Sequence, residues 1–328
     1  MARSTSDSFG AELLAGWPAP RIQWPDGKKF AFTVFDDPDF QTRERGEPVY
    51  DLLGDLGIFT TKGIFPGAAS TPAAGRNVTA LDPNFLDWLE RLKARGFELG
   101  WHGASPGPSD RASTLEGFET YRRLFGEWPR TLANHYECTE AIYWGVDRLS
   151  HPAHRFLYNA MTRWRNNNAF HGHTAGHPQF WGDLCRDRVR YVRNLVFRDI
   201  NTLAACPFMP YHDPDRPWVN LWYSSTNGHN YDTYIAAVAE ENQDRLEAEG
   251  GACIMYTHFA YGFVKDGKLQ PRFRELMERL AKKGGWYVPV ETLLGHIQNQ
   301  RGRVTITPRQ RTALERRWLR YKATSGTA

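Results

Sequence analysis

The sequence predicts an α/β protein whose mainly parallel sheet forms a distorted, incomplete (β/α) barrel. Strand-like and helical segments alternate along most of the chain, an order that places helices around a parallel sheet. The helical segments carry recognisable start and stop signals. The chain of 328 residues is longer than a typical domain, but (β/α) barrels reach this length as one unit.

Individual elements follow from local patterns. Aromatic and β-branched residues over 29–35 predict the first buried strand. A helix is expected to begin at Asp82, because an N-cap acid followed by Pro83 is a start signal, and to end at Gly96. The other expected elements are helices over 50–56, 115–125, 139–149, 231–249, 271–283 and 291–300, strands over 58–65, 97–101, 252–256 and 286–290, and a short segment over 130–135.

Breaks in this alternation set the expected domain limits. Residues 1–28 are predicted to form an irregular arm, and residues 29–300 the barrel. The stretch 151–223 is dense in Arg, His, Trp, Asn and Pro and longer than a normal connection, so we expect an insertion that covers one face. Residues 301–328 are predicted to form a basic helical tail. A docked terminal helix is favoured over a membrane-surface helix because the segment is short.

Composition limits the class of protein. No apolar run approaches the roughly 20 residues that span a bilayer, and no secretory signal is recognisable, which predicts a soluble, cytoplasmic protein. The four cysteines have no paired spacing and are expected to be reduced. The net charge of +4 is modest, and its arginines form no nucleic-acid-sized block. We therefore expect no nucleic-acid partner, whereas an oligomer is compatible with the sequence.

Polar groups at the ends of predicted strands indicate where chemistry occurs. Asp36 and Asp37 follow the first strand, and His102, His135 and His258 follow later strands or strand-like segments. In a (β/α) barrel these ends meet at one face. One carboxylate with imidazoles suits zinc or a similar divalent ion, which activates water for hydrolysis of an amide or ester. The alternative for the acid pair is a turn after a core strand, because Asp-Pro pairs often start turns.

These residues resemble a known family. The order Thr33-Val34-Phe35-Asp36-Asp37, then Glu98-Leu99-Gly100-Trp101-His102, then a late strand ending in His258, is similar to the polysaccharide deacetylase (NodB-homology) family of carbohydrate esterases. The resemblance covers about 29–297. It implies a barrel that removes N- or O-acyl groups from sugars with a divalent metal. By position, it implies Asp36 as catalytic base, Asp37 and His102 as metal ligands, and His258 as general acid.

The chain departs from the family pattern at three places. Pro38 replaces the glycine after the acid pair, Pro106 stands where the second metal histidine is expected, and Ala133-Asn134-His135 replaces an Arg-Pro-Pro type of segment. We hypothesise that His135 supplies the missing imidazole. The alternative to an enzyme is a carbohydrate-binding or regulatory protein that kept the barrel and lost the ion.

Aromatic side chains mixed with amides and hydroxyls predict a sugar-binding surface. Such a mixture suits a ring with apolar faces and polar edges. An edge strand that fills the core is an equally good explanation. The predicted substrate is a carbohydrate, possibly linked to a nucleotide or a lipid. The residues predicted to contact it are Asn134, Trp181, Tyr211, His212, Asp213, Trp222 and Tyr223.

Overall fold

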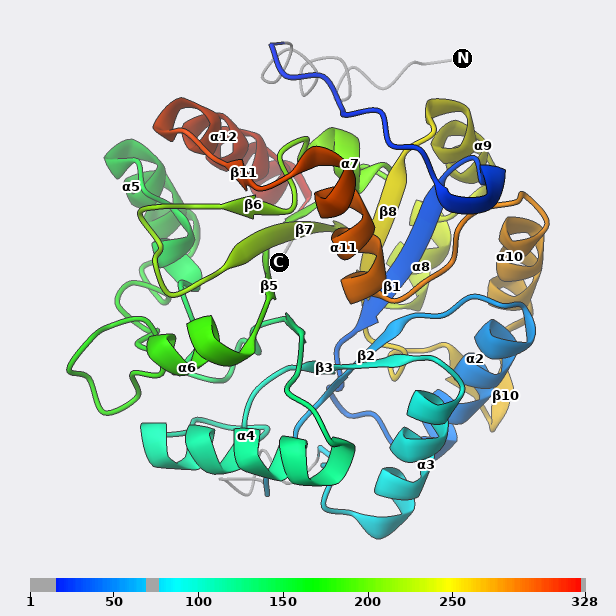
Figure 1. Ribbon diagram of the computed structural model, residues 1–328, viewed down its shortest axis with the longest axis horizontal. Helices are drawn as coiled ribbons and strands as arrows, with labels where there is room; N and C mark the ends of the chain where they lie inside the picture. Colours follow the sequence, from blue (N-terminus) through cyan, green and yellow to red (C-terminus); the bar gives the residue numbers. More distant parts are fainter. Residues whose placement is uncertain (1–15, 69–76, 326–328) are drawn as a thin grey trace.

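The apolar run after Lys29 forms the first strand of a parallel barrel. The computed structural model describes residues 16–68 and 77–325. Strand β1 is buried along its whole length and pairs in parallel with β2 and β8. Pairing of β7 with β8 joins the two edges of the sheet, so seven parallel strands close into a barrel within the described residues (Figure 1). The barrel strands are Ala31–Asp36 (β1), Thr61–Ile64 (β2), Glu98–Trp101 (β3), Thr131–Leu132 (β4), Tyr191–Phe197 (β5), Leu221–Asn227 (β7) and Ala252–Thr257 (β8).

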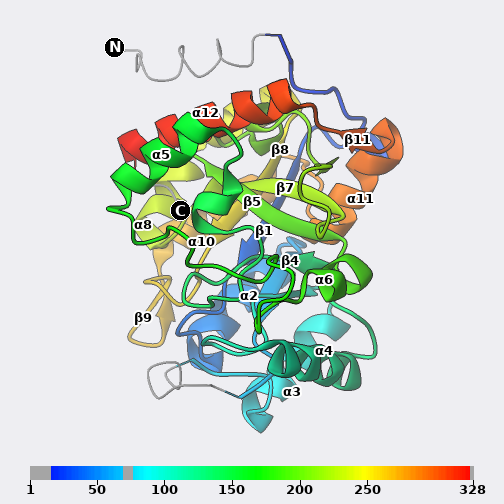
Figure 2. The same ribbon diagram turned by 90° about the vertical axis from the view of Figure 1, so that its left-hand side faces the viewer.

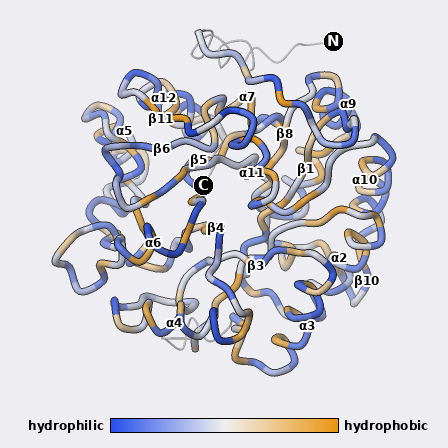
Figure 3. Tube along the Cα trace, in the orientation of Figure 1, coloured by the Kyte–Doolittle hydropathy of each residue, from blue (hydrophilic) through white to orange (hydrophobic). Residues whose placement is uncertain are grey.

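Helices surround the barrel and turn apolar faces toward it. In α3, Asp82 accepts a hydrogen bond from the Phe85 amide, as its N-cap position predicts, and Phe85, Leu89 and Leu92 are buried. Figure 3 shows hydrophilic and hydrophobic residues alternating along such outer helices. The helices are Arg43–Asp55 (α2), Pro83–Ala94 (α3), Arg111–Phe125 (α4), Pro152–Met161 (α5), Gly182–Arg188 (α6), Thr202–Ala205 (α7), Tyr231–Ala237 (α8), Glu240–Glu249 (α9), Pro271–Ala281 (α10), Val290–Arg301 (α11) and Pro308–Ser325 (α12), with 3₁₀ turns Pro25–Gly27 (η1) and Gly145–Arg148 (η3).

Short strands complete the architecture. Tyr211–His212 (β6) pairs antiparallel with β7, and Val304–Thr305 (β11) continues the sheet outward from β6. Val264–Lys265 (β9) and Lys268–Leu269 (β10) form a separate hairpin. These strands lie outside the closed ring of the barrel.

The ring of Phe35 occupies space that neighbouring strands leave open. A Cβ atom added to Gly100 would lie 2.8 Å from this ring, and one added to Gly63 would lie 3.1 Å from it. Both glycines are therefore required for close packing rather than for a special backbone conformation. The inward direction of Phe35 also fixes the direction of its neighbours, because side chains alternate along a strand.

The C-terminal tail forms α12, which lies beside α5 (Figure 2). Trp318 is buried and stacks on Tyr158 of α5 at 5.7 Å between ring centroids. Tyr321 contacts Phe197 of β5 edge to face. The tail is thus docked on the barrel through aromatic contacts. The short length of the segment had favoured this arrangement over a membrane-surface helix.

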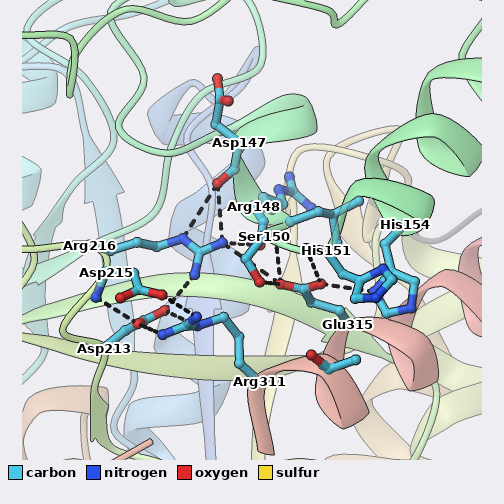
Figure 4. A network of polar contacts seen from close by, with 12 residues as sticks. Asp147, Arg148, Ser150, His151, His154, Asp213, Asp215, Arg216, Arg311 and Glu315 are labelled. Atoms are coloured by element: carbon cyan, nitrogen blue, oxygen red, sulfur yellow. Dashed lines mark hydrogen bonds and ion pairs between the residues drawn. The ribbon is translucent and has the colours of Figure 1, made fainter. Parts of the chain in front are cut away.

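A buried polar network anchors α12 (Figure 4). Arg311 forms ion pairs with Asp213 and Asp215, and Arg216 also pairs with Asp213. Glu315 accepts hydrogen bonds from the backbone and hydroxyl of Ser150 at 2.7 Å. The network therefore fixes the segment after η3 against both α12 and the residues that follow β6.

The structure corrects the predicted insertion. Residues 151–223 include β5 and the start of β7, two strands of the barrel. The pattern concealed them because β5 carries Arg193 and Asn194, so it lacks the continuous apolar run of a typical buried parallel strand. Most of the predicted arm, residues 1–15, lies outside the described residues.

Two predicted elements are also wrong. Over 139–149 the chain forms turns and the short η3 instead of an α-helix, because Tyr143 and Gly145 adopt positive φ angles. Over 286–290 only Trp286 forms a bridge, to Ala31, and α11 begins at Val290. The predicted helix 231–249 is divided into α8 and α9.

Candidate functional site

The two adjacent acids at the end of β1 point in different directions. Asp36 lies next to Lys62, its partner across β1 and β2, and accepts a hydrogen bond from Tyr50 of α2. Asp37 instead forms a two-pronged ion pair with Arg193 of β5, at 2.9 and 2.5 Å. The alternation of side chains along an extended backbone explains this divergence. The sequence predicted that the two acids share one site. In the structure they do not converge on one point.

Asp36 is sealed away from solvent. Its side chain is fully buried, its Oδ2 lies 3.3 Å from the Lys62 ammonium, and its Oδ1 accepts the Phe259 amide at 2.8 Å. Burial raises the pKa of Asp36, although Lys62 and the hydrogen bonds oppose that shift. Because its side chain is fully buried beside Lys62 and does not line the cleft described below, Asp36 has the surroundings of a structural ion pair rather than of a catalytic base.

A third carboxylate, Asp39, lies at the centre of the imidazoles. Its Oδ1 is 2.8 Å from Nε2 of His135, and its Oδ2 is 3.4 Å from Nε2 of His102 and 3.2 Å from Nε2 of His258. The three histidines follow β3, β4 and β8, whose carboxyl ends meet at this face of the barrel. The structure therefore brings the three predicted histidines together around an acid that the sequence analysis overlooked.

The charge of Asp39 controls the electrostatics of the cluster. Burial would raise its pKa, but hydrogen bonds with His102, His135 and His258 hold that pKa well below the ordinary value. Burial likewise would lower the pKa values of His135 and His258, and Asp39 raises both above the ordinary value. Burial dominates at His102, whose pKa is lowered. Asp39 is thus ionised and stabilises a proton on two of its neighbours.

Other contacts fix the orientation of the imidazoles. Nδ1 of His258 lies 2.9 Å from the carbonyl oxygen of His229, and its ring stacks on Tyr261. Nδ1 of His135 is 3.5 Å from Sγ of Cys138. Nδ1 of His102 is buried without a hydrogen-bond partner among the described residues, at 3.8 Å from Asp37. These contacts turn Nε2 of each ring toward Asp39.

The described residues offer two overlapping groups that could hold a metal ion. One consists of Asp39, His102 and His135, and the other of Asp37, Asp39 and His258. Within each group the candidate ligand atoms lie within 4.8 Å of one another. Two imidazoles and a carboxylate form a donor set that divalent zinc commonly uses.

The residues of the cluster line a cleft. Its volume is about 380 Å³, within the range of small-molecule sites. Asp37, Asp39, His102, His135 and His258 all line it, whereas Asp36 does not. Further lining residues include the aromatic side chains Tyr136, Trp144, Tyr158, Tyr256 and Tyr261 and the cationic side chains Arg148, Arg193 and Lys322.

Most of the predicted sugar-contacting residues lie elsewhere. Asn134 lines the cleft, although its amide is engaged with the backbone of Ile142. The others are absent from the lining of the cleft. Trp181 packs against Trp101 and Phe118, Asp213 belongs to the anchoring network, and Tyr211, His212, Trp222 and Tyr223 belong to the short or barrel strands β6 and β7. The alternative explanation, side chains that fill the core, therefore fits most of this set.

Two functional residues escaped the sequence analysis. Asp39 is the third acid in Asp36-Asp37-Pro38-Asp39, and its position two residues after Asp37 was the available signal. Arg193 lay in the supposed insertion. A charged residue inside a strand-like run was the available signal, but the sequence alone does not distinguish a barrel strand from a surface segment at this position.

Comparisons with known proteins address the fold. No family model matches the sequence, and no curated protein matches it at a significant level. A solved structure described as a polysaccharide deacetylase from Mycobacterium smegmatis superimposes with a TM-score of 0.53 at 14% identity, over 88% of this chain and 98% of that one. The chain has the fold of a polysaccharide deacetylase.

Two further solved structures match less well. The peptidoglycan deacetylase PdaC from Bacillus subtilis has a TM-score of 0.40 at 14% identity, over 85% of this chain and 95% of that one. A family 4 acetyl xylan esterase from Clostridium thermocellum, in complex with a cobalt ion, has a TM-score of 0.38 at 13% identity, over 87% and 95%. The superposition on the Mycobacterium smegmatis structure confirms the predicted barrel fold.

A membrane span is not found among the described helices, none of which is both long and apolar enough to cross a bilayer.

Proposed function

We propose that this protein is a metal-dependent hydrolase that removes an N- or O-acyl group from a sugar. The observation that carries the proposal is the convergence of three imidazoles on the Asp39 carboxylate, all of which line one cleft. A salt bridge that served only stability would not need three histidines at the carboxyl ends of separate strands. The deacetylase-type fold supports the same chemistry.

The residues fit a divalent ion held by Asp39, His102 and His135. Their candidate ligand atoms lie within 4.8 Å of one another, close enough to share one ion, and Nε2 of both imidazoles faces the Asp39 carboxylate. When bound, such an ion supplies positive charge that polarises an acyl carbonyl and acidifies water. Zinc is the first candidate for this donor set.

Asp37 is the proposed proton acceptor. Its carboxylate lines the cleft beside His102 and is held by both amino groups of Arg193. Burial would raise its pKa, but Arg193 and His102 lower it, so the group is ionised at neutral pH. This proposal moves the base from Asp36 to Asp37 and the carboxylate ligand from Asp37 to Asp39.

His258 is the proposed proton donor to the leaving group. Its contact with the His229 carbonyl orients the ring, and Asp39 raises its pKa in spite of burial. A protonated imidazole at the rim of the cluster can donate a proton to a departing amine or alkoxide. The aromatic lining of the cleft suits the apolar face of a sugar ring.

The decisive experiment compares Asp37→Asn with Asp39→Asn. We expect Asp37→Asn to retain a divalent ion and to lose at least about 100-fold in turnover, the usual scale for a general base. Asp39→Asn should lose both the ion and turnover. Elemental analysis of the purified proteins and acetate release from a panel of acylated sugars provide the measurements, and circular dichroism checks that each variant folds.

Different outcomes separate the competing assignments. Loss of the ion in Asp37→Asn, with retention in Asp39→Asn, would support the assignment derived from the family pattern instead. Wild-type protein that binds no ion and releases no acetate, but still binds sugars, would favour the carbohydrate-binding alternative.

A further inference from the structure

Arg148 is a buried cation that the proposed reaction does not use. It ends η3, is 4% exposed and lines the same cleft as Asp39. Its guanidinium carbon lies 3.2 Å from the ring centroid of Trp144 and 5.1 Å from that of Trp318. The guanidinium is thus held by two aromatic side chains, which supply apolar surface and cation–π attraction but no negative charge.

The other buried arginines of the described chain have carboxylate partners within ion-pair distance. Arg193 pairs with Asp37, Arg216 and Arg311 pair with Asp213, and Arg317 lies 4.0 Å from Asp199. Arg148 has no such partner among the described residues, and its Nε is buried without a hydrogen-bond partner. Taking an unpaired cation out of water is costly, so an anion that entered the cleft would compensate for this cost.

A second cation increases the positive charge at this part of the cleft. Lys322 of α12 also lines it, 5.7 Å from the ring centroid of Tyr158. Burial and the charge of Arg148 lower the pKa of Lys322 to about 8, and burial lowers that of Arg148 to about 10. Both cationic side chains thus line the same cleft and are withdrawn from water.

The position of Arg148 is fixed before any ligand binds. Its carbonyl oxygen accepts a hydrogen bond from Arg216 at 2.7 Å, and Ser150 is tied to Glu315 (Figure 4). These contacts connect η3 to α12. A side chain on such a rigid support loses little conformational entropy when it binds a ligand.

We propose that Arg148 binds an anionic group of the substrate, so that the cleft selects an acidic sugar, carrying a carboxylate or a phosphate, over a neutral one. The inference rests on the proposed function, because it names the class of sugar that the hydrolase would accept. The planar guanidinium can donate two parallel hydrogen bonds to either oxyanion. Arg148 and the Asp39 cluster line the same cleft of about 380 Å³, a volume sufficient for a sugar ring.

Binding of unacylated sugars tests the inference independently of hydrolysis. We would titrate the purified full-length protein with glucuronate, glucose 6-phosphate and glucose by calorimetry. Tryptophan fluorescence would follow the same titrations, because Trp144 and Trp318 flank the guanidinium. At least one acid should bind about tenfold or more tightly than glucose, as expected for hydrogen bonds with charged groups. Whichever acid binds more tightly identifies the oxyanion as carboxylate or phosphate.

Variants connect the preference to Arg148. Arg148→Gln should abolish the preference for the acid and leave glucose affinity unchanged. The control is Arg123→Gln, at an exposed position of α4 that forms no ion pair among the described residues; it removes the same charge elsewhere and should bind as wild type. If Arg148→Gln does not fold, Arg148→Lys decides, with an expected loss of about threefold or more because the paired donors are lost.

Two results would overturn the inference. One is wild-type protein that binds neither acid more tightly than glucose. The other is a folded Arg148 variant that keeps the full preference. Failure of the proposed hydrolysis would appear instead as absence of bound ion or of acetate release, which these titrations do not measure.

Discussion

At the scale of single residues, a shift of one position changes the function of an acid. The apolar run before Asp36 predicted the strand correctly, and alternation then sends Phe35 and Asp37 inward and Asp36 toward α2. The sequence contains this information. Asp36 and Asp37 could share one site only if the strand ended or twisted at the acid pair, because neighbouring side chains of an extended strand point to opposite faces. The pairing of Asp36 with Lys62 could not be inferred, because the sequence does not reveal which residues of two neighbouring strands lie opposite each other.

The ion pair of Asp36 and Lys62 leads to a stability prediction. Lys62→Met leaves the Asp36 carboxylate buried without its cation, so the free energy of unfolding should fall by about 3–5 kcal/mol. Lys28→Met, which removes an exposed lysine, should change it by less than about 0.5 kcal/mol. Urea unfolding followed by circular dichroism measures both. A loss of less than about 1 kcal/mol in Lys62→Met would contradict the assigned role.

At the scale of elements, predictions succeeded where start and stop signals were strong. The cap and proline at the start of α3 and the buried stripe behind them follow from local chemistry. Strands β5 and β7 were not predicted as barrel strands because they carry buried polar residues, among them Arg193 and Ser224. Their partners come from distant parts of the chain, so the local sequence alone gives no reason for those side chains.

The docking of α12 gives a prediction at this scale. Glu315→Gln keeps the shape of the side chain but weakens the hydrogen bonds with Ser150 and His154, so stability should fall by about 1–3 kcal/mol. Glu90→Gln, at an exposed position of α3, is the matched control and should have little effect. Hydrogen exchange measured by mass spectrometry should show faster exchange in α12 of the Glu315 variant. Unchanged exchange there would argue against the anchoring role.

At the scale of the whole molecule, the barrel class was predictable from the sequence and is confirmed. The residues that make up the candidate site were only partly predictable. Alternating elements identify the architecture, and strand ends locate His102, His135 and His258. The charged pair Asp37–Arg193, between β1 and β5, depends on closure of the ring, whereas Asp36–Lys62 depends on the register of the neighbouring strands β1 and β2. That closure is a property of the complete fold rather than of any segment.

A partly buried carboxyl joins several elements of the barrel and leads to a pH prediction. Glu98 of β3 accepts hydrogen bonds from Thr61 of β2, Thr131 of β4 and the Glu291 amide of α11. Burial raises its pKa from 4.5 to about 7 despite these bonds. Between these values the folded state holds a proton that the unfolded state has released, so stability should fall as the pH rises from about 4.5 to 7.

Urea unfolding at several pH values checks this dependence. Glu98→Gln should flatten the decline without removing it, because burial also raises the pKa of Glu140 to about 7. A decline of equal slope in wild type and variant would show that Glu98 does not hold the proton.

The position of Lys322 and Trp318 on the last helix has a consequence for biosynthesis. Both contribute to the surroundings of a cleft whose first carboxylates are encoded nearly three hundred residues earlier. A ribosome must therefore translate the chain as far as this helix before the pocket can assemble. Premature termination between His258 and this helix would yield a polypeptide that carries every proposed catalytic group yet lacks part of the wall that encloses its ligand.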